Sequence, residues 1–349
     1  MATTAAPQSS AEARPLARKK FQPAEVAFEW ALRLSIALAL GALVWLFVSV
    51  LTEGASSLSW DFLTSKASSS AARAGFKNAL YGSLVLMMIT VAVAVPLGFA
   101  AATYLEKFAP MSKDELRVIA MRRQRALEHR RGHGLSGIRL LLARIGVAAS
   151  RVWATIGPPI NRIVEVNISN LAAVPSIIYG LLGLALFVSI MGVSKSLLAG
   201  GLTLAILVLP IIIIASREAI RAVPSSIEQG AMALGATKWQ AVRSQVLPAA
   251  LPGMLTGTIL ATSRAIGETA PLIVVGGAAY STKVPSLNPL QAGDQPLLAM
   301  PLQIFDWVER PQETLWGPLA AAGILVLIGT LVVMNLIAIV LRNRFSRSW

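Results

Sequence analysis

Cysteine is absent from the 349-residue sequence, and histidine occurs only twice, at His129 and His133. Without cysteine the chain can have neither a disulfide framework nor a thiolate metal site. The two histidines are four residues apart in an arginine-rich stretch, but no second pair of candidate ligands lies near them. The sequence therefore predicts no metal site and no bound metal cofactor.

Charged residues are also scarce, at 14% of the chain, whereas 55% of the residues are hydrophobic and the mean hydropathy is +0.65. This composition excludes an ordinary soluble domain and is typical of a membrane protein with several spans. The sequence also lacks a G-x-x-x-x-G-K-[ST] loop that could hold ATP phosphates. We therefore predict an all-α polytopic membrane protein that is not itself an ATPase or any other enzyme.

Long apolar runs recur along the chain, each near the ~20 residues needed to cross a bilayer. Six transmembrane helices are expected, at residues 28–51, 79–105, 168–190, 197–216, 249–279 and 317–341. The third and fourth runs are separated by only a few residues, which predicts a helical hairpin.

The basic residues are distributed unevenly around these spans. Of the 31 Lys and Arg residues, 23 lie in the two tails and in the second and fourth segments between spans, and 6 lie in the other three segments. Because Lys and Arg beside a span resist translocation, both termini are expected in the cytoplasm. The net charge of +14 thus reflects membrane topology and anionic lipid, and we predict no nucleic-acid partner.

The expected organisation follows from this topology. It comprises a disordered cytoplasmic tail at 1–27, a first transmembrane helix at 28–51, an external loop at 52–76, a core of spans 2 to 5 at 77–279, an external loop at 280–316, a last transmembrane helix at 317–341 and a cytoplasmic tail at 342–349.

Residues 111–151 form the most basic part of the core. Apolar residues there share one helical face that arginines interrupt, a pattern typical of a basic amphipathic helix lying on an anionic membrane surface. Docking of a regulatory partner would require the same pattern, and the sequence leaves both interpretations open.

The fifth apolar run contains two charged residues, Arg264 and Glu268, four positions apart. At this spacing the two side chains share a helical face and can pair, and Gly267 and Pro271 loosen the helix beside them. Charged groups at this depth are costly unless they are paired or line a wet path. An arginine oriented by a carboxylate presents a forked cationic donor, which favours an anionic substrate, although a purely structural ion pair is the alternative.

A polar segment at 224–248 interrupts the apolar runs. Ser225 and Glu228 have the spacing of a helix-capping box, which predicts a short helix over 226–234. Gly235 would then turn the chain, and Thr237 would cap a second helix over 238–247 that ends at Pro248. The segment is thus expected to be two short helices hinged at a glycine.

The same segment, read as GAMALGATKWQAVRSQVLP, resembles the cytoplasmic EAA loop of binding-protein-dependent ABC importer permeases. Gly235, Leu247 and Pro248 stand where that pattern requires them, whereas Gln229 stands at the usual glutamate position and Glu228 lies one residue earlier. The resemblance implies a type I ABC importer permease fold in which this loop contacts the ATPase. It implies coupling roles for Glu228, Gln229, Gly230, Ala231, Gly235, Ala236, Leu247 and Pro248.

A second set of motifs indicates the substrate. SRAIGETAPLIVVG at 263–276 is similar to a motif of phosphate-import permeases, and ETAPL resembles the PstA-type subunit in particular. AVPSIIYGLLGLALFV at 173–188 and NALYGSL at 78–84 resemble other stretches of that subunit. The resemblance implies that Arg264, Glu268 and Thr269 line the path of inorganic phosphate. Residues 111–151 are longer than the corresponding link in the family and look inserted.

The resemblance further implies a heterocomplex in a bacterial cytoplasmic membrane. Its expected partners are a PstC-type permease subunit, a dimer of ATPase subunits that binds ATP and Mg, an extracytoplasmic phosphate-binding protein and membrane lipids. No cofactor is expected on this chain.

Three other functions fit parts of the pattern. A permease for another oxyanion or for an organic solute would have the same loop. A secondary anion transporter or channel would explain the charges within the span but not the polar segment at 224–248. A scaffold or signalling subunit would explain the basic residues at 111–151 but not the charges within the span.

Overall fold

The computed structural model describes residues 23–109, 121, 148, 159–278, 280–281 and 283–345. Most of the predicted tail at 1–27, nearly all of the basic stretch at 111–151 with both histidines, and the end of the tail at 342–349 lie outside this range. The chain divides into two units, residues 1–49 and 50–349, and each is described by itself.

The first unit contains most of α1, a helix of 32 residues over Pro23–Gly54. Apolar residues lie on all of its faces, a pattern typical of a membrane span. Arg33 forms an ion pair with Glu29, one turn earlier on the same helix.

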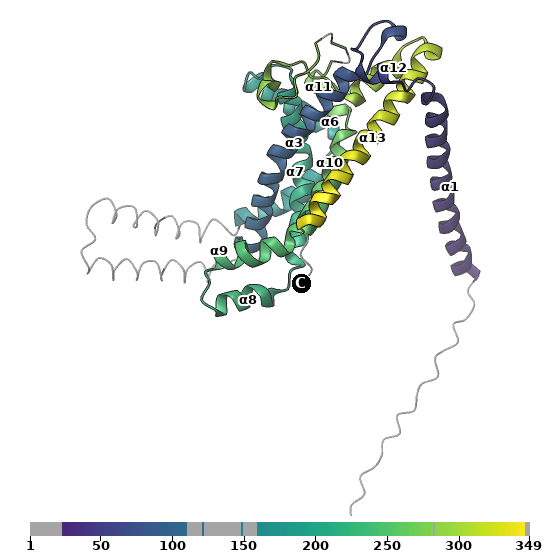
Figure 1. The fold of residues 1–349 in the computed structure, drawn as a ribbon. Coiled ribbons are helices and arrows are strands. Elements are labelled where there is room, and N and C mark those ends of the chain that lie inside the picture. The colour runs from purple at the N-terminus through teal and green to yellow at the C-terminus, as the bar shows by residue number, and fades with distance from the viewer. Residues whose placement is uncertain are drawn as a thin grey trace, which may run out of the picture. The chain divides into compact units, whose positions relative to one another are not determined.

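Four long helices build the second unit: α3 (Lys77–Thr103), α7 (Leu197–Arg221), α10 (Leu247–Ile266) and α13 (Glu313–Phe345). Helix α7 packs against both α3 and α10, and α10 packs in turn against α13 (Figure 1). In the most apolar 18-residue window of α7, 67% of the residues are buried within the chain. In the corresponding window of α13, none is buried. Helix α7 is therefore the centre of the bundle.

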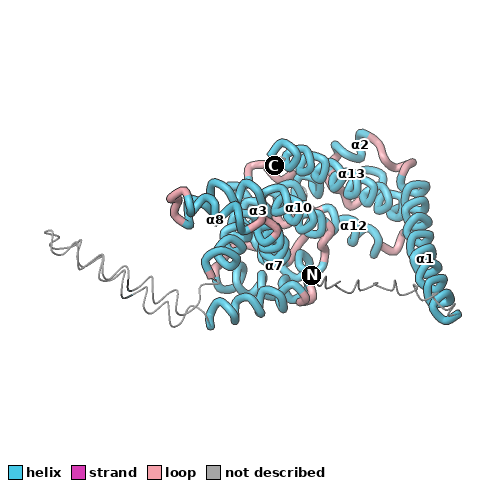
Figure 2. The backbone as a smooth tube through the Cα atoms, turned by 90° about the horizontal axis from the view of Figure 1, so that it is seen from below, coloured by secondary structure: helices cyan, strands magenta, loops and turns pink. Residues whose placement is uncertain are grey.

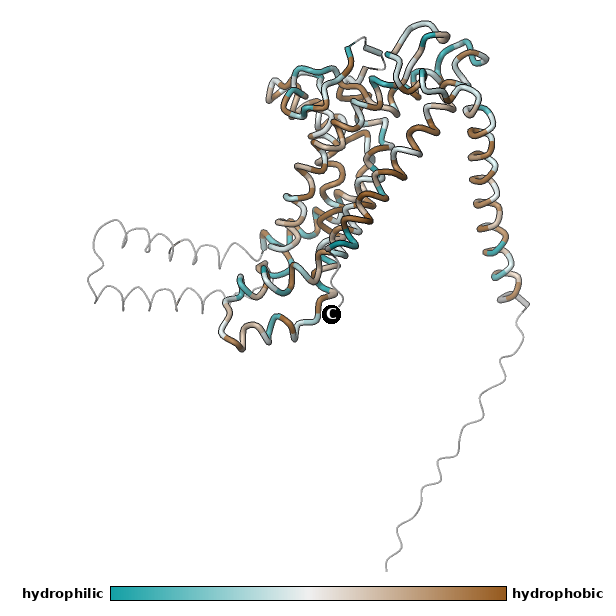
Figure 3. The backbone as a smooth tube through the Cα atoms, viewed as in Figure 1, coloured by the Kyte–Doolittle hydropathy of each residue, from teal (hydrophilic) through white to brown (hydrophobic). Residues whose placement is uncertain are grey.

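The predicted fold class is confirmed. The described residues form helices and loops without a named strand, and the only strand-like pairing among them is an isolated bridge between Ser196 and Pro296 (Figure 2). Five helices are long and apolar enough to cross a membrane, or six if a bent pair counts as one span. Hydrophobic residues predominate along the long helices of the second unit, and hydrophilic residues gather toward its two ends (Figure 3).

The third predicted span differs from the structure because it is not a straight helix. It consists of the helix Pro159–Ala172 and a second helix over Ser176–Ile190, bent by 112° at the break between them. The second piece begins as α6 (Ser176–Gly183) and continues as a π-helical segment, η3 (Leu184–Ile190). Pro175 explains the break, because its ring disfavours helical conformation in the preceding residue and its nitrogen has no hydrogen to donate.

The fifth predicted span, 249–279, also differs. A single helical run begins at Lys238 and ends at Ile266, comprising α9 (Lys238–Ala241), a π-helical turn η4 (Val242–Val246) and α10. The chain then breaks before a separate short helix, α11 (Ala270–Val275). Pro248 therefore does not end a helix. The widened π turn before it accommodates the proline ring and its missing N–H within a continuous helix.

Both segments predicted as external loops contain helices, and the two pack together at one end of the second unit. Residues 52–76 include α2 (Trp60–Thr64) and the 3₁₀ turn η1 (Ala71–Arg73), and residues 280–316 include the 3₁₀ segment η5 (Pro289–Asp294) and α12 (Met300–Glu309). The rings of Phe62, Phe76 and Trp307 lie within 5.5–6.0 Å of one another, and Trp316 lies 6.1 Å from Trp307. This aromatic cluster extends the apolar core of the bundle to its α12 end.

The opposite end carries the polar segment. Helix α8 (Ser225–Ala233) follows α7 directly, and α9 returns the chain to the bundle. A further π-helical turn, η2 (Tyr104–Phe108), extends α3 at this end of the bundle.

Close approach of α7 and α10 depends on Gly257. A Cβ atom at this position would lie 2.3 Å from the Cβ of Ala215 on α7. A Cβ at Gly329, an exposed position of α13, would meet nothing within 4 Å. We expect Gly257→Val to separate the two helices and lower the thermal unfolding temperature of the purified chain in detergent by several degrees. Gly329→Val is the matched control and should leave that temperature unchanged within about 1 °C. Equal melting of the two variants would contradict this account of the α7–α10 contact.

Candidate functional site

Arg264 lies in the last turn of α10. About half of its side chain is exposed (49%), although it belongs to a helix whose other residues include fully buried alanines on both sides, Ala261 and Ala265. The described part of the chain therefore leaves one side of this guanidinium uncovered.

The predicted partner of Arg264 is present. The Nε of Arg264 donates a hydrogen bond of 3.0 Å to Oε1 of Glu268, and the Glu268 side chain is only 16% exposed. The pair does not lie on a continuous helix, however. Helix α10 ends at Ile266, with Gly267 as its C-cap, and Glu268 belongs to the turn that leads to α11. Pro271, in the first turn of α11, has no N–H to donate to a continuous helix. Thr269 precedes α11 and is half-buried.

The turn between α10 and α11 is covered by α6. A Cβ on Gly180 of α6 would lie 2.7 Å from Cα of Pro271, so the two short helices are in direct backbone contact. Tyr179, beside this glycine, donates a hydrogen bond of 2.7 Å to the carbonyl of Leu171 across the bend of the third span. The helices that follow the two breaks in the apolar spans, α6 and α11, thus pack against each other.

Asn335, on α13, contacts the residue that precedes Arg264, and sequence reasoning missed this contact. The hydroxyl of Ser263 lies 2.7 Å from Oδ1 of Asn335, and Ser263 immediately precedes Arg264. A polar contact between helices in an apolar region fixes their relative position. The signal in the sequence was a lone asparagine in the middle of the last apolar run.

The free donors of Arg264 decide what the site can bind. A guanidinium has five N–H donors, and Glu268 takes only the one on Nε. The four on its terminal nitrogens have no hydrogen-bond partner among the described residues. They form a fork that matches two oxygens of one oxyanion, while the carboxylate holds the fork in place.

The segment 224–248 has the predicted two helices, but its second helix continues past Pro248 and the predicted cap of its first helix is absent. Helix α8 spans Ser225–Ala233, but its N-cap is Pro224, and no side chain caps it. The predicted capping box of Ser225 and Glu228 is therefore wrong. Glu228 turns instead toward α3, where its Oε2 accepts a hydrogen bond of 2.8 Å from Nζ of Lys107.

The turn between α8 and α9 has the predicted chemistry. Gly235 adopts a φ of +92°, a conformation that costs other residues energy and glycine none. Thr237 caps α9, and its capping box is complete because the Gln240 side chain accepts from the Thr237 backbone N–H at 2.8 Å.

The eight residues predicted for coupling do not form one cluster. Gln229, Gly230 and Gly235 are exposed on α8 and the turn, whereas Ala231, Ala236 and the pair Leu247–Pro248 are half-buried. Leu247 lines an apolar pocket of about 430 Å³ beneath α9, together with Phe99 and Trp239.

Sequence reasoning missed the most exposed apolar surface of this segment. Leu234 is 93% exposed at the tip of the turn, and Met232 and Trp239 on either side of it are 39% and 53% exposed. Exposed large apolar side chains of this kind are typical of a surface that contacts another protein or a membrane.

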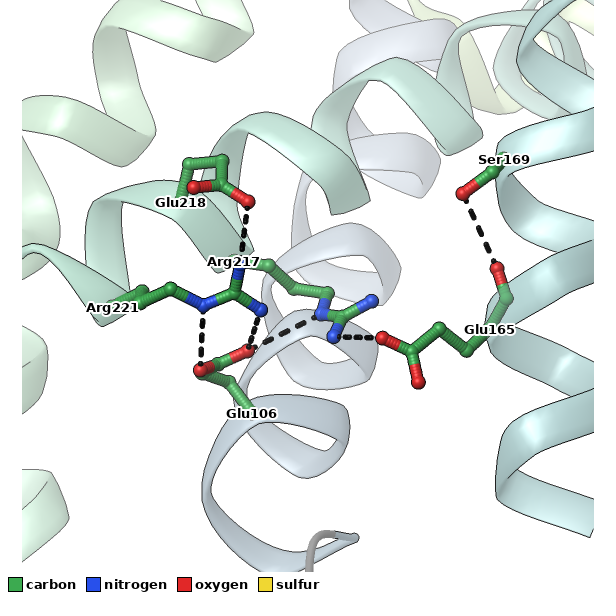
Figure 4. A network of polar contacts seen from close by, with 6 residues as sticks. All are labelled: Glu106, Glu165, Ser169, Arg217, Glu218 and Arg221. Atoms are coloured by element: carbon green, nitrogen blue, oxygen red, sulfur yellow. Dashed lines mark hydrogen bonds and ion pairs between the residues drawn. The ribbon is translucent and has the colours of Figure 1, made fainter. Parts of the chain in front are cut away.

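A network of ion pairs lies behind α8, at the ends of three spans (Figure 4). Glu106 in the π turn of α3 bonds to Arg221 of α7 at 3.1 and 3.2 Å and to Arg217 of α7 at 3.4 Å. Arg217 also donates to Glu165 of the helix Pro159–Ala172 at 2.6 Å, and Arg221 to Glu218 at 3.0 Å. The sequence showed only separate charged residues at the ends of apolar runs, and nothing in their spacing predicted that they meet.

Residues 145–346 match the profile of the family described as binding-protein-dependent transport system inner membrane component. The chain is 28% identical over 274 residues to the probable ABC transporter permease protein YqgI of Bacillus subtilis, covering 78% of this chain and 74% of that protein. Two relatives are named phosphate transport system permease proteins: PstA 1 of Mycobacterium tuberculosis strain H37Rv, 27% identical over 77% of this chain and 70% of its own length, and PstA of Haemophilus influenzae, 28% identical over 83% of each.

Among solved structures, the chain is similar to a chain of the inward-facing MetNI methionine ABC transporter, with a TM-score of 0.40 and 17% identity over 75% of this chain and 98% of that one. The family profile covers more than half of the present sequence, and the helices long enough to cross a membrane agree with it. This multi-pass membrane protein is an ABC transporter permease subunit and belongs to the family of binding-protein-dependent transport system inner membrane components.

Proposed function

We propose that this chain is the PstA-type permease subunit of an ATP-driven importer of inorganic phosphate. The observation that carries the proposal is the guanidinium of Arg264, which is half exposed, is held on one side by Glu268 and has terminal donors with no partner among the described residues. Relatives named phosphate permeases that align over most of the chain support the same substrate.

The chemistry of the site favours a tetrahedral oxyanion. A forked cation at a partly covered position in an apolar span offers two parallel charge-assisted hydrogen bonds to one phosphate group. Glu268 orients the fork and also competes with the anion for it, so that binding stays weak enough for release. Thr269, at the start of α11, would add a hydroxyl donor to the same path.

The open side of Arg264 is where the path would run. A permease subunit of this family works with a second permease subunit, and we place the phosphate path between this chain and a PstC-type partner. Glu268 faces the break between α10 and α11, where helical backbone is interrupted, and interrupted backbone at membrane depth is tolerated where it lines a path or is covered by protein.

Energy for transport would come from a partner ATPase dimer that binds ATP and Mg. The exposed apolar tip of Leu234, with Met232 and Trp239, is the surface we assign to that contact, together with the exposed residues Gln229 and Gly230. Closure of the ATPase would move α8 and α9, and the spans would alternate between open states. A phosphate-binding protein would deliver the anion at the α12 end, with both termini in the cytoplasm as the positive residues predict.

Phosphate-dependent ATPase activity of the reconstituted complex tests substrate and partner together. The complex of this chain, its partner permease and the ATPase in liposomes, supplied with the binding protein, should hydrolyse ATP several-fold faster with phosphate than with sulfate or molybdate. Stimulation by sulfate or molybdate instead would assign the chain to another oxyanion. Stimulation by none of the three would contradict the proposed substrate class.

Arg264→Gln should lower phosphate uptake by about tenfold to a hundredfold, because loss of a charged hydrogen bond costs about 1.5–3 kcal/mol. Arg264→Lys should remain impaired, since an ammonium cannot bind two oxygens in parallel. The matched control is Arg33→Gln, which also removes an arginine paired with a glutamate four residues away on a membrane helix. Uptake is measured with radiolabelled phosphate at equal amounts of assembled complex, and normal uptake by Arg264→Gln would exclude the anion-binding role.

Gly235→Val should weaken binding of the ATPase, because valine at a φ of +92° costs about 1–2 kcal/mol or forces the α8–α9 turn to change shape. Gly192→Val is the matched control. Gly192 also has a positive φ, +68°, and a Cβ there meets nothing within 4 Å, but it lies outside the segment 224–248. Co-purification of the ATPase with each variant measures the effect. Full retention by Gly235→Val would show that the shape of this turn is not part of the contact.

A further inference from the structure

Helix α8 is weakly attached to the bundle. None of its residues is buried, and it packs chiefly against α9 and the π turn η4, which are its neighbours in the chain. Apolar contacts therefore do not fix its position relative to the spans. Among the described residues, the side-chain bond that joins α8 to a different span is the pair of Glu228 with Lys107.

The pair is sheltered from solvent. The Lys107 side chain is 15% exposed and the Glu228 side chain 13%, and Nζ lies 2.8 Å from Oε2. Solvent screening reduces the attraction within exposed ion pairs to near zero. The attraction within a sheltered pair is screened less, and loss of one partner leaves the other charge without compensation.

Lys107 and Glu106 are adjacent in the π turn η2, and they point to different elements. Lys107 reaches α8, whereas Glu106 bonds to Arg217 and Arg221 on α7 (Figure 4). π-helical turns inside helices are frequent at functional positions, and this one carries two opposite charges to two different partners.

The chain of ion pairs continues to the bent span. Arg217 is 13% exposed and bonds to Glu165 on the helix Pro159–Ala172, which leads into the break at Pro175 and so to α6. Helix α6 lies against α11, beside the turn that holds Glu268. The network therefore joins α8 to the second, third and fourth spans, and the third span contacts the site of Arg264.

We infer that Lys107 is a positioning residue for transport: its bond to Glu228 latches α8 to the second span, and Glu106, Arg217 and Glu165 carry displacement of α8 into the fourth and third spans. The inference rests on the proposed ATPase contact of α8. It assigns Glu228 inward, to the body of the permease, and leaves the exposed residues of the segment to the partner. An ion pair that only stabilised the fold would require the same bond, but its loss would not change the amount of phosphate transported per ATP hydrolysed.

Charge exchange separates the two roles. We expect Lys107→Glu and Glu228→Lys, each in the reconstituted complex, to keep ATP hydrolysis but to lower phosphate transported per ATP by at least tenfold. The double variant Lys107→Glu/Glu228→Lys restores the pair with opposite polarity and should return this ratio to within about threefold of the unmodified complex. Failure of the double variant to recover, while each single variant is impaired, would overturn the latch. So would a normal ratio in both single variants.

Arg243→Glu is the matched control. Arg243 is an exposed basic residue on the π turn η4 with no ion pair to any described residue, and its reversal changes the local charge equally. It should leave the ratio unchanged. An equal loss in this variant would attribute the effect to charge at this end of the bundle and overturn the assignment of Lys107.

A measurement without phosphate keeps the inference separate from the proposed substrate. Hydrogen–deuterium exchange of the α8 amides, followed by mass spectrometry in the assembled complex, should rise several-fold in each single variant and fall back in the double variant. If phosphate neither stimulates ATP hydrolysis nor is transported, the proposed function fails, but the exchange pattern still decides the latch. Unchanged exchange in Lys107→Glu would overturn it.

Discussion

Every backbone N–H and C=O in the apolar part of a membrane must have a hydrogen-bond partner within the protein, and this constraint governs the whole structure. It explains why the described apolar runs are helical apart from two interruptions, at Pro175 and at Gly267. It also explains why the helices that follow these interruptions, α6 and α11, pack together. The hydroxyl of Tyr179 bonds to the Leu171 carbonyl at the first break, and Pro271 of the second break lies in contact with Gly180. The helices that follow the two breaks thus pack against each other, and Arg264 lies in the last turn before the second break.

The sequence predicted the parts of this structure that depend on local chemistry. Hydropathy gave the fold class, and the spacing of Arg264 and Glu268 gave their pairing. Gly235 and Thr237 had the side chains that their turn and cap require, so the two-helix form of the segment followed from residue type alone.

The features that were missed depend on contacts between distant residues. Pro248 has the appearance of a helix terminator, but a π turn five residues wide allows the helix to continue through it. Glu228 has the spacing of a capping residue, but the ion pair with Lys107, 121 residues earlier, replaces that role. The aromatic cluster of Phe62 and Trp307 likewise joins two segments that each resemble a loop. The amount of burial, and thus the strength of such contacts, is a property of the folded chain and not of either sequence segment.

The uninterrupted helix from Lys238 to Ile266 has a mechanical consequence. At 1.5 Å per residue its 29 residues form a rod of roughly 43 Å, with Trp239 of the exposed tip at one end and Arg264 at the other. Tilting a rod of that length by about 10° shifts its far end by roughly 7.5 Å. Trp239 and Arg264 therefore lie near the two ends of one helical run, and a small rotation at Trp239 is a larger displacement at Arg264.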